Sequence, residues 1–582
     1  MNVNHKLLDT LYELGCRGNL VERLYSRMLD EDLFVAAYVK LYSNKGAMTV
    51  GVDENDQIDG MSLKRIRRII QKLENNQWQW KPARRTYIPK RNGGTRPLGI
   101  PTWSDKLVQE VMRMVLEAYY EPIFHDESHG FRPHRSCHTA LTHIRNVWTG
   151  VTWFVEGDIK GCFDNIDPDV LLGIIGRRIR DFRFLKLIRT MLKAGYWEVG
   201  RQYSTLAGTP QGGVISPLLA NIFLHELDDY ILTCLKPSFD KGKKRRHNRE
   251  YNRISAHITK AKKAGNWRKV KQFRKERRSV PAGEPYDNNY RRLVYIRYAD
   301  DFIIGVIGSK SDCRTVKGKV KAKLAELKLE LSDEKTKITN AASGKARFLG
   351  YDIFKFQDSR HLHLTGSIQL CVPKEKMREL AKRYMRQGKP YQRDGLINGE
   401  VAEIFMIYDL ELRGYYNHYR LAWDVGKQLA QLRYIMWQSL TRTLARKFRS
   451  RTRKMNQRYK GIGPKTGNRC LIVEVATPNR SKFVTFGDIS LKTDKSLRGE
   501  TGRDFFRPYL PVRELTVRLK HDRCELCSQV SNDLEVHHIR KLKDIRAKVK
   551  AGKAKRWQIA MCARNRKSLV VCIPCHNQIH SS

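Results

Sequence analysis

Two short apolar runs near the middle of the chain flank a pair of acidic residues. Residues 293–298 and 302–306 are rich in β-branched and aromatic side chains, so each is a predicted strand. The short spacing between them predicts a tight hairpin with Asp300 and Asp301 at its turn. An acidic pair between two strands is the most informative feature of the sequence.

A third carboxylate follows another predicted strand. Residues 152–157 form an apolar run typical of a buried strand, and Asp158 comes at its end. Further on, Asp167 and Pro168 suit an N-cap and the first helical position, so a helix is predicted from Pro168 to about Arg180.

Carboxylates on stiff strands are good ligands for hard divalent cations, and a pair of such cations can bind the attacking and leaving oxygens of a phosphoryl transfer. The alternative is that Asp300 and Asp301 are ordinary turn residues. The additional acid at a strand end favours the catalytic interpretation. At this point the chain resembles the reverse transcriptases, and the resemblance implies that Asp158, Asp300 and Asp301 are the three active-site aspartates that bind Mg²⁺.

Further sequence blocks follow in the order found in that family. Residues 88–109 resemble the fingers segment, and residues 129–140 and 210–224 are distinctive of reverse transcriptases encoded inside group II introns. Cationic side chains near a turn can form charge-assisted hydrogen bonds to phosphate oxygens. The structural alternative is that Gly-Gly pairs mark loops and that arginines such as Arg132 lie on a solvated face. The residues that the resemblance assigns to the incoming nucleotide are Arg84, Lys90, Arg96 and Gln211.

One aromatic residue close to the first aspartate has a more specific expected role. Phe163 lies five residues after Asp158, where the family places the aromatic ring that blocks a 2′-hydroxyl on the incoming nucleotide. Such a ring under the sugar would favour deoxynucleotides on steric grounds. The alternative is a core phenylalanine at a junction between a strand and a helix.

Composition agrees with a nucleic-acid enzyme. The chain has 582 residues with 111 Lys and Arg against 60 Asp and Glu, a formal charge of +51 that attracts polyanions. No apolar run approaches the length that spans a bilayer, so a membrane partner is not expected. The first residues show no signal or transit pattern. The resemblance implies a bacterial, cytoplasmic and nucleoid-associated protein, and it leaves an organellar origin open.

A strongly basic segment interrupts the predicted polymerase region. Residues 241–278 contain only two acids, Glu250 and Glu276, among many Lys and Arg. We expect an insertion over about 238–285 that is helical, projects from the body and contacts RNA. A solvated surface of no specific function is the equal alternative.

From about residue 372 the pattern becomes helical, with long amphipathic stretches at 401–414 and 428–447. Tyrosines and arginines are interleaved here, and residues 412–419 resemble the core of the thumb, or domain X, of intron-encoded maturases. Arg and Tyr can stack on unpaired bases and contact phosphates. The alternative for each ring is packing between helices. The aromatics concerned are Tyr408, Tyr415, Tyr416, Tyr419, Tyr434 and Trp437.

The C-terminus has two Cys-x-x-Cys pairs and four nearby histidines. The paired spacing is typical of a four-cysteine zinc site rather than disulfides. Together with the histidines it resembles the HNH nuclease motif, which implies His538 as general base and His537, His576 and His580 as ligands of a divalent metal, expected to be Mg²⁺. A structural zinc knuckle that binds DNA without cutting is the alternative. Ser568 stands where many HNH proteins carry Asn, with Asn565 nearby, so the middle Asn is left open. The zinc ligands are Cys524, Cys527, Cys572 and Cys575.

The resemblance extends along the whole chain and predicts an α+β multidomain protein: a right-hand polymerase fold with an antiparallel palm sheet, a helical thumb and a small HNH domain of ββα-metal type. It implies a group II intron-encoded protein that is an RNA-directed DNA polymerase, a maturase for its host intron RNA and a DNA endonuclease for intron mobility. The expected domains are 1–365 for fingers and palm, 366–475 for the thumb, 476–520 for DNA binding and 521–582 for the nuclease.

The expected partners are the intron RNA as a lariat ribonucleoprotein, target double-stranded DNA and deoxynucleotides, with a dimer as one arrangement. Two rivals are a retron-type reverse transcriptase and a maturase with a decayed polymerase. The thumb and HNH patterns argue against the first. The intact Asp158, Asp300, Asp301 and Phe163 argue against the second.

Overall fold

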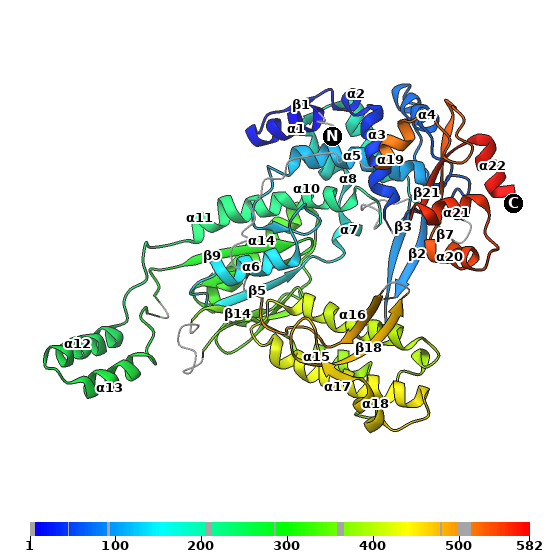
Figure 1. The fold of residues 1–582 in the computed structure, drawn as a ribbon. Coiled ribbons are helices and arrows are strands. Elements are labelled where there is room, and N and C mark those ends of the chain that lie inside the picture. The colour runs from blue at the N-terminus through cyan, green and yellow to red at the C-terminus, as the bar shows by residue number, and fades with distance from the viewer. Residues whose placement is uncertain are drawn as a thin grey trace.

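The computed structural model describes residues 6–44, 46–89, 93–198, 201–203, 212–284, 287–357, 366–477, 480–494, 496 and 514–581. Figure 1 shows a central sheet with helices above it, a mainly helical region below, and a C-terminal unit beside the N-terminal helices. The coarse expectation of a mixed α and β multidomain chain is confirmed. No helix in the described part of the chain is long and apolar enough to cross a membrane.

The central sheet has five strands in the order β11-β5-β10-β9-β4. β9 and β10 form the predicted hairpin, and β5 pairs antiparallel with β10. Both faces are buried, because alternate residues of β10 pack into different cores: Phe302 and Ile304 into one, Ile303 into the other. The strands are β4 (Ser128–His129), β5 (Trp153–Asp158), β9 (Arg292–Tyr298), β10 (Asp301–Ile307) and β11 (Ile338–Asn340).

Helices with well-formed N-caps cover the first of these cores. The side chain of Thr102 accepts from the Asp105 N–H at the start of α5, and Ser309 and Asp312 form a capping box at the start of α14. The helices are α5 (Trp103–Tyr120), α7 (Cys162–Asn165), α8 (Pro168–Gly176), α9 (Phe182–Lys193), α10 (Ser216–Asp229), η1 (Tyr230–Leu235), α11 (Lys236–Phe239) and α14 (Lys310–Glu326).

The predicted helix at Pro168 begins as expected, with Asp167 as N-cap, but α8 ends at Gly176 rather than near Arg180. The prediction of its end was wrong because Ile179 and Arg180 form β6 (Ile179–Arg180), which pairs with β1 (Val21–Glu22) near the N-terminus. A long-range strand pairing therefore shortens the helix.

The N-terminal part consists of helices that share the core of α5. A second sheet of order β3-β2-β7-β8 extends from this part, with β2 and β3 forming a long hairpin. The elements are α1 (Lys6–Arg17), α2 (Leu24–Met28), α3 (Glu31–Tyr42), α4 (Leu63–Glu74), β2 (Ala83–Pro89), β3 (Thr95–Ile100), β7 (Tyr196–Glu198) and β8 (Arg201–Tyr203).

The region below the central sheet contains the predicted long helices, of which the last ends at Tyr459, together with short strands between Ala346 and Pro390. Its core includes α6 (Cys137–Val147). The prediction missed a three-stranded sheet, β17-β18-β19, that packs against α16. The elements of the whole region below the central sheet are β12 (Ala346–Phe348), β13 (Tyr351–Lys355), β14 (Ile368–Cys371), α15 (Lys374–Lys382), β15 (Met385–Arg386), β16 (Lys389–Pro390), η2 (Asp394–Leu396), α16 (Val401–Tyr419), α17 (Val425–Lys447), α18 (Thr452–Tyr459), β17 (Lys460–Ile462), β18 (Arg469–Thr477) and β19 (Arg480–Phe486).

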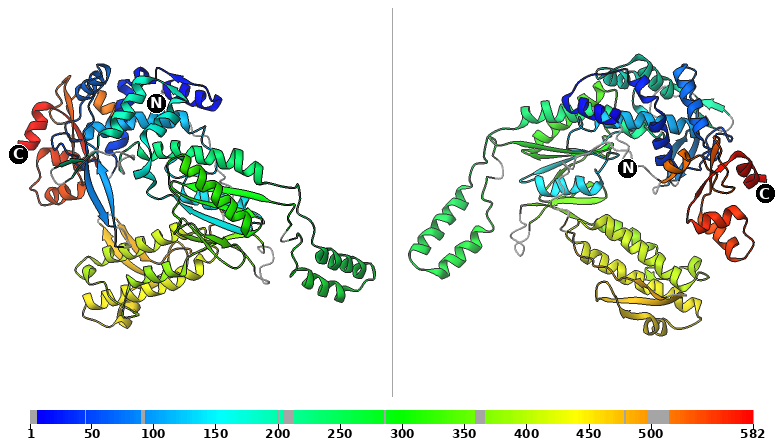
Figure 2. Two further views of the ribbon diagram at one scale, coloured as in Figure 1. Left: turned by 180° about the vertical axis from the view of Figure 1, so that it is seen from behind. Right: turned by 45° about the horizontal axis from the view of Figure 1, so that its top comes forward.

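The basic segment forms a helical hairpin of α12 (Arg249–Lys263) and α13 (Trp267–Arg277), here called the basic hairpin. It projects from the body in all three views, as predicted (Figures 1 and 2). Its small separate core contains Ile254, Ile258 and Val270. Its surface is therefore largely free for a partner.

The C-terminal unit contains an antiparallel strand pair, β20 and β21, followed directly by α22. Two helices, α20 and α21, lie between the two strands in sequence. The elements are α19 (Glu514–Lys520), β20 (Leu534–His538), α20 (Leu542–Lys550), α21 (Arg556–Ala563), β21 (Ser568–Cys572) and α22 (Ile573–Ser581). Part of the expected DNA-binding stretch, including 497–513, lies outside the described residues.

Candidate metal centres

Three aspartates meet at one end of the central sheet, and we call them the carboxylate centre. The two-residue turn of the hairpin is Ala299 and Asp300, and Asp301 is the first residue of β10. Asp301 lies directly opposite Asp158 of β5 in the antiparallel register. The structure therefore brings together the three acids that the sequence singled out.

Like charges make this centre electrostatically unfavourable on its own. Loss of hydration and the charges of Asp300 and Asp158 raise the pKa of Asp301 to about 7, although its side chain keeps part of its surface in solvent. Loss of hydration and the charge of Asp158 also raise the pKa of Asp300. Lys335 Nζ donates to Asp158 Oδ2 at 2.7 Å and compensates in part. Clustered oxygens that repel one another fit divalent cations.

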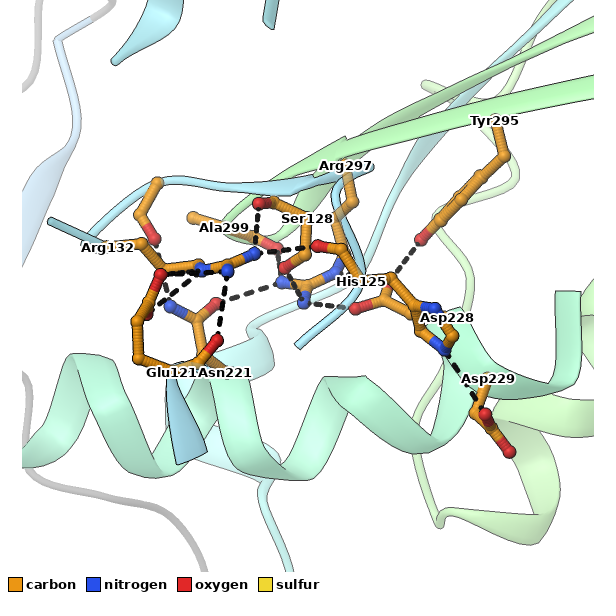
Figure 3. A network of polar contacts seen from close by, with 11 residues as sticks. Glu121, His125, Ser128, Arg132, Asn221, Asp228, Asp229, Tyr295, Arg297 and Ala299 are labelled. Atoms are coloured by element: carbon orange, nitrogen blue, oxygen red, sulfur yellow. Dashed lines mark hydrogen bonds and ion pairs between the residues drawn. The ribbon is translucent and has the colours of Figure 1, made fainter. Parts of the chain in front are cut away.

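A buried arginine fixes the turn that carries Asp300. Arg297 is fully buried and forms an ion pair with Asp228 of α10, with Nη2 and Oδ2 2.6 Å apart. Its Nη1 donates to the Ala299 carbonyl at 2.8 Å and to Asn221 Oδ1 at 3.0 Å, as Figure 3 shows. Ala299 has φ of +56°, a conformation that side chains rarely adopt. The arginine therefore holds a strained turn against α10.

The same network contradicts the solvated-face alternative for Arg132. This side chain is buried and pairs with Glu121, with Nη2 and Oε1 2.8 Å apart (Figure 3). It also donates to the carbonyls of His125 and Ser128. Arg132 therefore anchors the loop that leads into β4.

Two of the predicted nucleotide-binding residues, Arg96 and Phe163, are near the carboxylate centre. Arg84 of β2 and Arg96 of β3 are exposed on the long hairpin, and the charge of Arg96 lowers the pKa of nearby Asp300. Lys90 and Gln211 lie outside the described residues. Phe163 of α7 is half-buried and lines a small pocket together with Ala299 and Asp300. Phe163 is therefore next to the acidic turn rather than deep in the core.

The four C-terminal cysteines form a second cluster, the cysteine centre. Their sulfur atoms all lie within 4.8 Å of one another. Cys524 and Cys527 come from a loop, Cys572 ends β21 and Cys575 begins α22. Burial alone would raise the pKa of Cys524, but backbone N–H groups that point at its sulfur lower it to about 7. Four convergent sulfurs, of which Cys524 has a lowered pKa, fit a structural Zn²⁺ that would bind them as thiolates.

Three of the four histidines form a third cluster with an unexpected aspartate. One ligand atom from each of His537, His576, His580 and Asp59 lies within 4.8 Å of the others, and we call this the histidine centre. Glu535 Oε2 is 2.6 Å from His576 Nδ1 on the outer side. Imidazole nitrogens suit a divalent transition metal, and the carboxylate oxygen also suits Mg²⁺, the expected metal.

His538 does not belong to this cluster. Successive side chains of a strand point to opposite faces, so His538 of β20 points away from His537. Its Nε2 is 2.6 Å from the hydroxyl of buried Tyr38, and its ring packs on Tyr42. Burial lowers the pKa of His538 to about 4. His538, the expected general base, is therefore neutral, but Tyr38 and Tyr42 cover its ring.

No pattern in the sequence pointed to Asp59 or Tyr38 as part of this site. Both lie in the N-terminal part of the chain, and Asp59 is 479 residues from His538. Glu535 could have been found, because it is two residues before His537 and therefore on the same face of β20. Of the two candidates for the middle Asn, Asn565 bonds to Arg546 and Ser568 pairs with His538 across the strands.

Most aromatic rings of the helical region pack between elements. Tyr408 and Tyr419 are buried, and Tyr415, Tyr416 and Trp437 are half-buried. Tyr434 on α17 is 64% exposed. The packing alternative therefore holds for the two buried rings, and Tyr434 is the ring best placed for an external base.

The chain matches three family models along its length. Residues 88–353 match the reverse transcriptase (RNA-dependent DNA polymerase) model, residues 365–498 the type II intron maturase model, and residues 524–576 the AI2M/AI1M-like HNH endonuclease model. Their order is the one that the sequence resemblance implies.

Similar proteins also cover most of the chain. The group II intron-encoded protein LtrA of Lactococcus lactis subsp. cremoris is 40% identical over 96% of this chain and 95% of LtrA. The uncharacterized 91 kDa protein in cob intron of Schizosaccharomyces pombe is 35% identical over 100% of this chain and 73% of that protein. Protein YkfC of Escherichia coli K12 is 34% identical over 62% of this chain and 90% of YkfC.

Proposed function

This chain belongs to the group II intron-encoded proteins, and on that premise we propose how its centres share the work of moving an intron into DNA. It is a multifunctional enzyme with reverse transcriptase, maturase and HNH endonuclease domains. The observation that carries the proposal is that one chain holds a carboxylate centre within the first match, and two clusters able to hold a metal whose cysteines and first histidines lie in the third.

For polymerisation, Asp158, Asp300 and Asp301 are the proposed ligands of Mg²⁺. When bound, the cations would lower the charge on the oxygens that attack and leave during nucleotidyl transfer. The protein's own part is to hold the carboxylates on paired strands, with Arg297 fixing the turn. This central sheet is the proposed palm of a right-hand polymerase.

The incoming deoxynucleotide is proposed to lie between the β2–β3 hairpin and the carboxylate centre. Arg84 and Arg96, with Lys90 between them in sequence, would bind the triphosphate, and Gln211 is a further proposed substrate contact. Phe163 borders the same pocket as Asp300, which supports its proposed role in excluding a 2′-hydroxyl. The β2–β3 hairpin and the N-terminal helices would then form the fingers within residues 1–365.

For maturase activity, residues 366–475 are the proposed thumb, and the basic hairpin is a proposed additional RNA contact. The hairpin supports this role because it projects from the body and its only acids are Glu250 and Glu276. Removing phosphate contacts reduces the slope of log affinity against log salt by roughly 0.7–0.9 for each phosphate. Deletion of the basic hairpin should therefore weaken the binding of intron RNA and reduce the dependence of that binding on salt concentration. An unchanged slope would mean that the basic hairpin is a solvated surface that does not contact the RNA.

For nicking, the histidine centre is the proposed metal site, Mg²⁺ the proposed metal, and His538 the proposed general base. The cysteine centre would hold Zn²⁺ and tie the loop, β21 and α22 together within residues 521–582. Because His538 is covered by Tyr38, it must leave its pocket before it can take a proton from water. Residues 476–520 would contact the DNA target next to this domain.

The proposed order of events joins these activities. The protein assists splicing of its intron and stays with the lariat RNA, which reverse-splices into one DNA strand. The nuclease then nicks the other strand, and the new 3′-hydroxyl primes copying of the intron. This sequence would take place at the nucleoid in the bacterial cytoplasm.

The test uses the ribonucleoprotein on a labelled duplex that carries the intron insertion site. The wild-type complex should yield RNA insertion, a nick in the second strand and complementary DNA that starts at the nick. Asp300→Asn should retain insertion and nicking but yield no complementary DNA, and His537→Ala should stop after insertion. Complementary DNA that starts at the nick in both variants would contradict the assignment of the two centres.

A further inference from the structure

The C-terminal unit is docked against the N-terminal part by specific contacts. Residues 60 and 61 add to the edge of β20: the Gly60 N–H donates to the Val536 carbonyl at 3.2 Å, and the Val536 N–H donates to the Met61 carbonyl at 2.9 Å. Lys64 pairs with Asp533 at 2.9 Å. Residues 31–64, which include α3 and this edge segment, are here called the N-terminal cover. The cover therefore lies directly against the strand that carries His537 and His538.

Asp59 of the cover points into the histidine centre. Its Oδ2 is 2.7 Å from His580 Nε2 and 3.3 Å from His576 Nε2, and its Oδ1 is 3.4 Å from His537 Nδ1. Asp59 Oδ1 also accepts the His538 backbone N–H at 2.6 Å. A single carboxylate thus contacts all three histidines and the strand that carries them.

The buried histidine of the cluster has the features of a metal ligand. His537 is 5% exposed, and neither of its ring nitrogens has a hydrogen-bond partner of normal geometry among the described residues. A buried polar atom without a partner is costly, and a metal would satisfy it. The ring is held in place by edge-to-face packing on Trp557.

A catalytic metal site keeps coordination positions open for water or substrate, and each additional protein ligand occupies one of them. We propose that Asp59 is the fourth protein ligand of the nuclease metal in the resting protein, and that a phosphate of the DNA target displaces it. This inference rests on the proposed nuclease function. The same docking places Tyr38 against His538. The N-terminal cover therefore blocks access of DNA and water to one coordination position of the metal and to the general base.

Displacement is chemically reasonable because the two ligands resemble each other. Phosphate and carboxylate are both anionic oxygen donors, so DNA can replace Asp59 without changing the charge at the site greatly. The cover then has to move away from β20, which also exposes His538. Cleavage would thereby be restricted to DNA that is bound well enough to open the cover.

The first measurement is metal affinity in the full-length protein loaded with zinc. Co²⁺ bound by histidine and carboxylate has weak visible absorption bands that differ from those of cysteine-bound Co²⁺, so the histidine centre can be titrated separately. Asp59→Asn keeps an oxygen that can accept the His538 N–H but removes the charge, and we expect at least tenfold weaker Co²⁺ binding. Asp53→Asn, on the same segment but paired with Lys81, is the matched control and should bind as wild type. Unchanged affinity in Asp59→Asn would overturn the ligand assignment.

The second measurement is second-strand nicking by the ribonucleoprotein at saturating Mg²⁺. Without the competing carboxylate, Asp59→Asn should nick faster than wild type, by several-fold. Tyr38→Phe removes the hydroxyl that bonds His538 and should also nick faster, with unchanged Co²⁺ affinity. Nicking by Asp59→Asn that is slower than wild type would mean that Asp59 is needed during cleavage, and the displacement would be wrong.

A third variant separates this inference from the proposed function. His537→Ala removes a ligand in either case and should abolish nicking. If His537→Ala nicks normally, the nuclease assignment of the centre fails, whatever Asp59 does. Primer extension by each variant checks that the rest of the chain remains folded.

Discussion

The carboxylate centre and the histidine centre both suit divalent cations, but the protein prepares them in opposite ways. At the carboxylate centre, loss of hydration and mutual repulsion raise the pKa of Asp300 and Asp301. At the histidine centre, burial alone would lower the pKa of His576, but Asp59 and Glu535 raise it. The first centre therefore needs cations to relieve its charge, whereas the second already contains an opposite charge.

The two centres also differ in how far apart their residues lie in sequence and structure. The three aspartates lie on paired strands of one sheet, held by the Arg297 network. The histidine centre joins β20 and α22 to a residue of the N-terminal cover. A rigid centre suits repeated nucleotide addition, and a centre made of two docked parts suits a single cleavage that must be controlled.

The largest expected effect is loss of polymerisation without loss of nicking. Asp300→Asn removes a charge that binds the metal, and a metal stabilises the transition state by several kcal/mol. Losing this stabilisation should slow primer extension on the order of a thousandfold or more. Asp333→Asn changes an exposed aspartate that pairs with Lys317 and Lys321, so it should extend primers normally. Extension is measured on an annealed RNA template with Mg²⁺. If Asp300→Asn also lost nicking, the two centres would not be independent.

A comparison of two neighbouring histidines comes next in size. His537→Ala should lose both metal affinity and nicking, because its side chain faces the histidine centre. His538→Ala should keep metal affinity yet nick about a hundred- to ten-thousandfold more slowly, the usual contribution of a general base. The measurements are Co²⁺ titration and single-turnover nicking of the second strand. Normal nicking by His538→Ala would show that another group is the base.

A substitution beside the carboxylate centre should change the choice of substrate more than the rate. Phe163→Val opens space next to Asp300, so incorporation of ribonucleotides relative to deoxynucleotides should rise by about tenfold or more. Single-nucleotide extension measures the ratio. Phe131→Val changes the exposed ring that packs edge-to-face on Phe163, and it should have a smaller effect on the same ratio. An unchanged ratio in Phe163→Val would mean that another residue excludes the 2′-hydroxyl.

These centres also differ in how much the sequence could predict. The hairpin of β9 and β10 and the strand end at Asp158 follow from local apolar runs and a short turn, so the meeting of the three aspartates was foreseeable. In the same way, the spacing of the two Cys-x-x-Cys pairs predicted that the four cysteines lie together. Asp59 and Tyr38 could not be predicted, because their contacts depend on the docking of parts at opposite ends of the chain.

The same distinction between local and long-range signals holds for the fold. The start of α8 was predictable from Asp167 and Pro168, but its end depends on the pairing of β6 with β1 far away in sequence. The β-branched residues Ile472, Val473 and Val475 of β18 were a local strand signal that the helical expectation for this region overlooked. Arg132 looked like a surface residue, since only the folded loop shows that Glu121 neutralises it.

The smallest expected effect is on stability, and it has opposite signs at the two centres. The folded-state pKa of Asp301 is raised to about 7, so the native protein loses stability as pH rises from about 4 to 7, where only the unfolded chain releases this proton freely. Asp301→Asn removes this cost and should raise the melting temperature at pH 8 in magnesium-free buffer, on the order of 1–3 °C.

The pKa of Asp59 is instead held well below its usual range by His537 and His576, against the effect of burial. Asp59→Asn should therefore lower the melting temperature at pH 8. The difference for Asp301→Asn should shrink as pH falls toward 4, because protonated Asp301 resembles Asn. The difference for Asp59→Asn should persist down to about pH 4 and be lost only below it, as pH falls toward the depressed folded-state pKa of Asp59. Calorimetry of the zinc-loaded chain measures both variants, and a fall in melting temperature for both at pH 8 would contradict the view that the carboxylate centre is strained by its own charge.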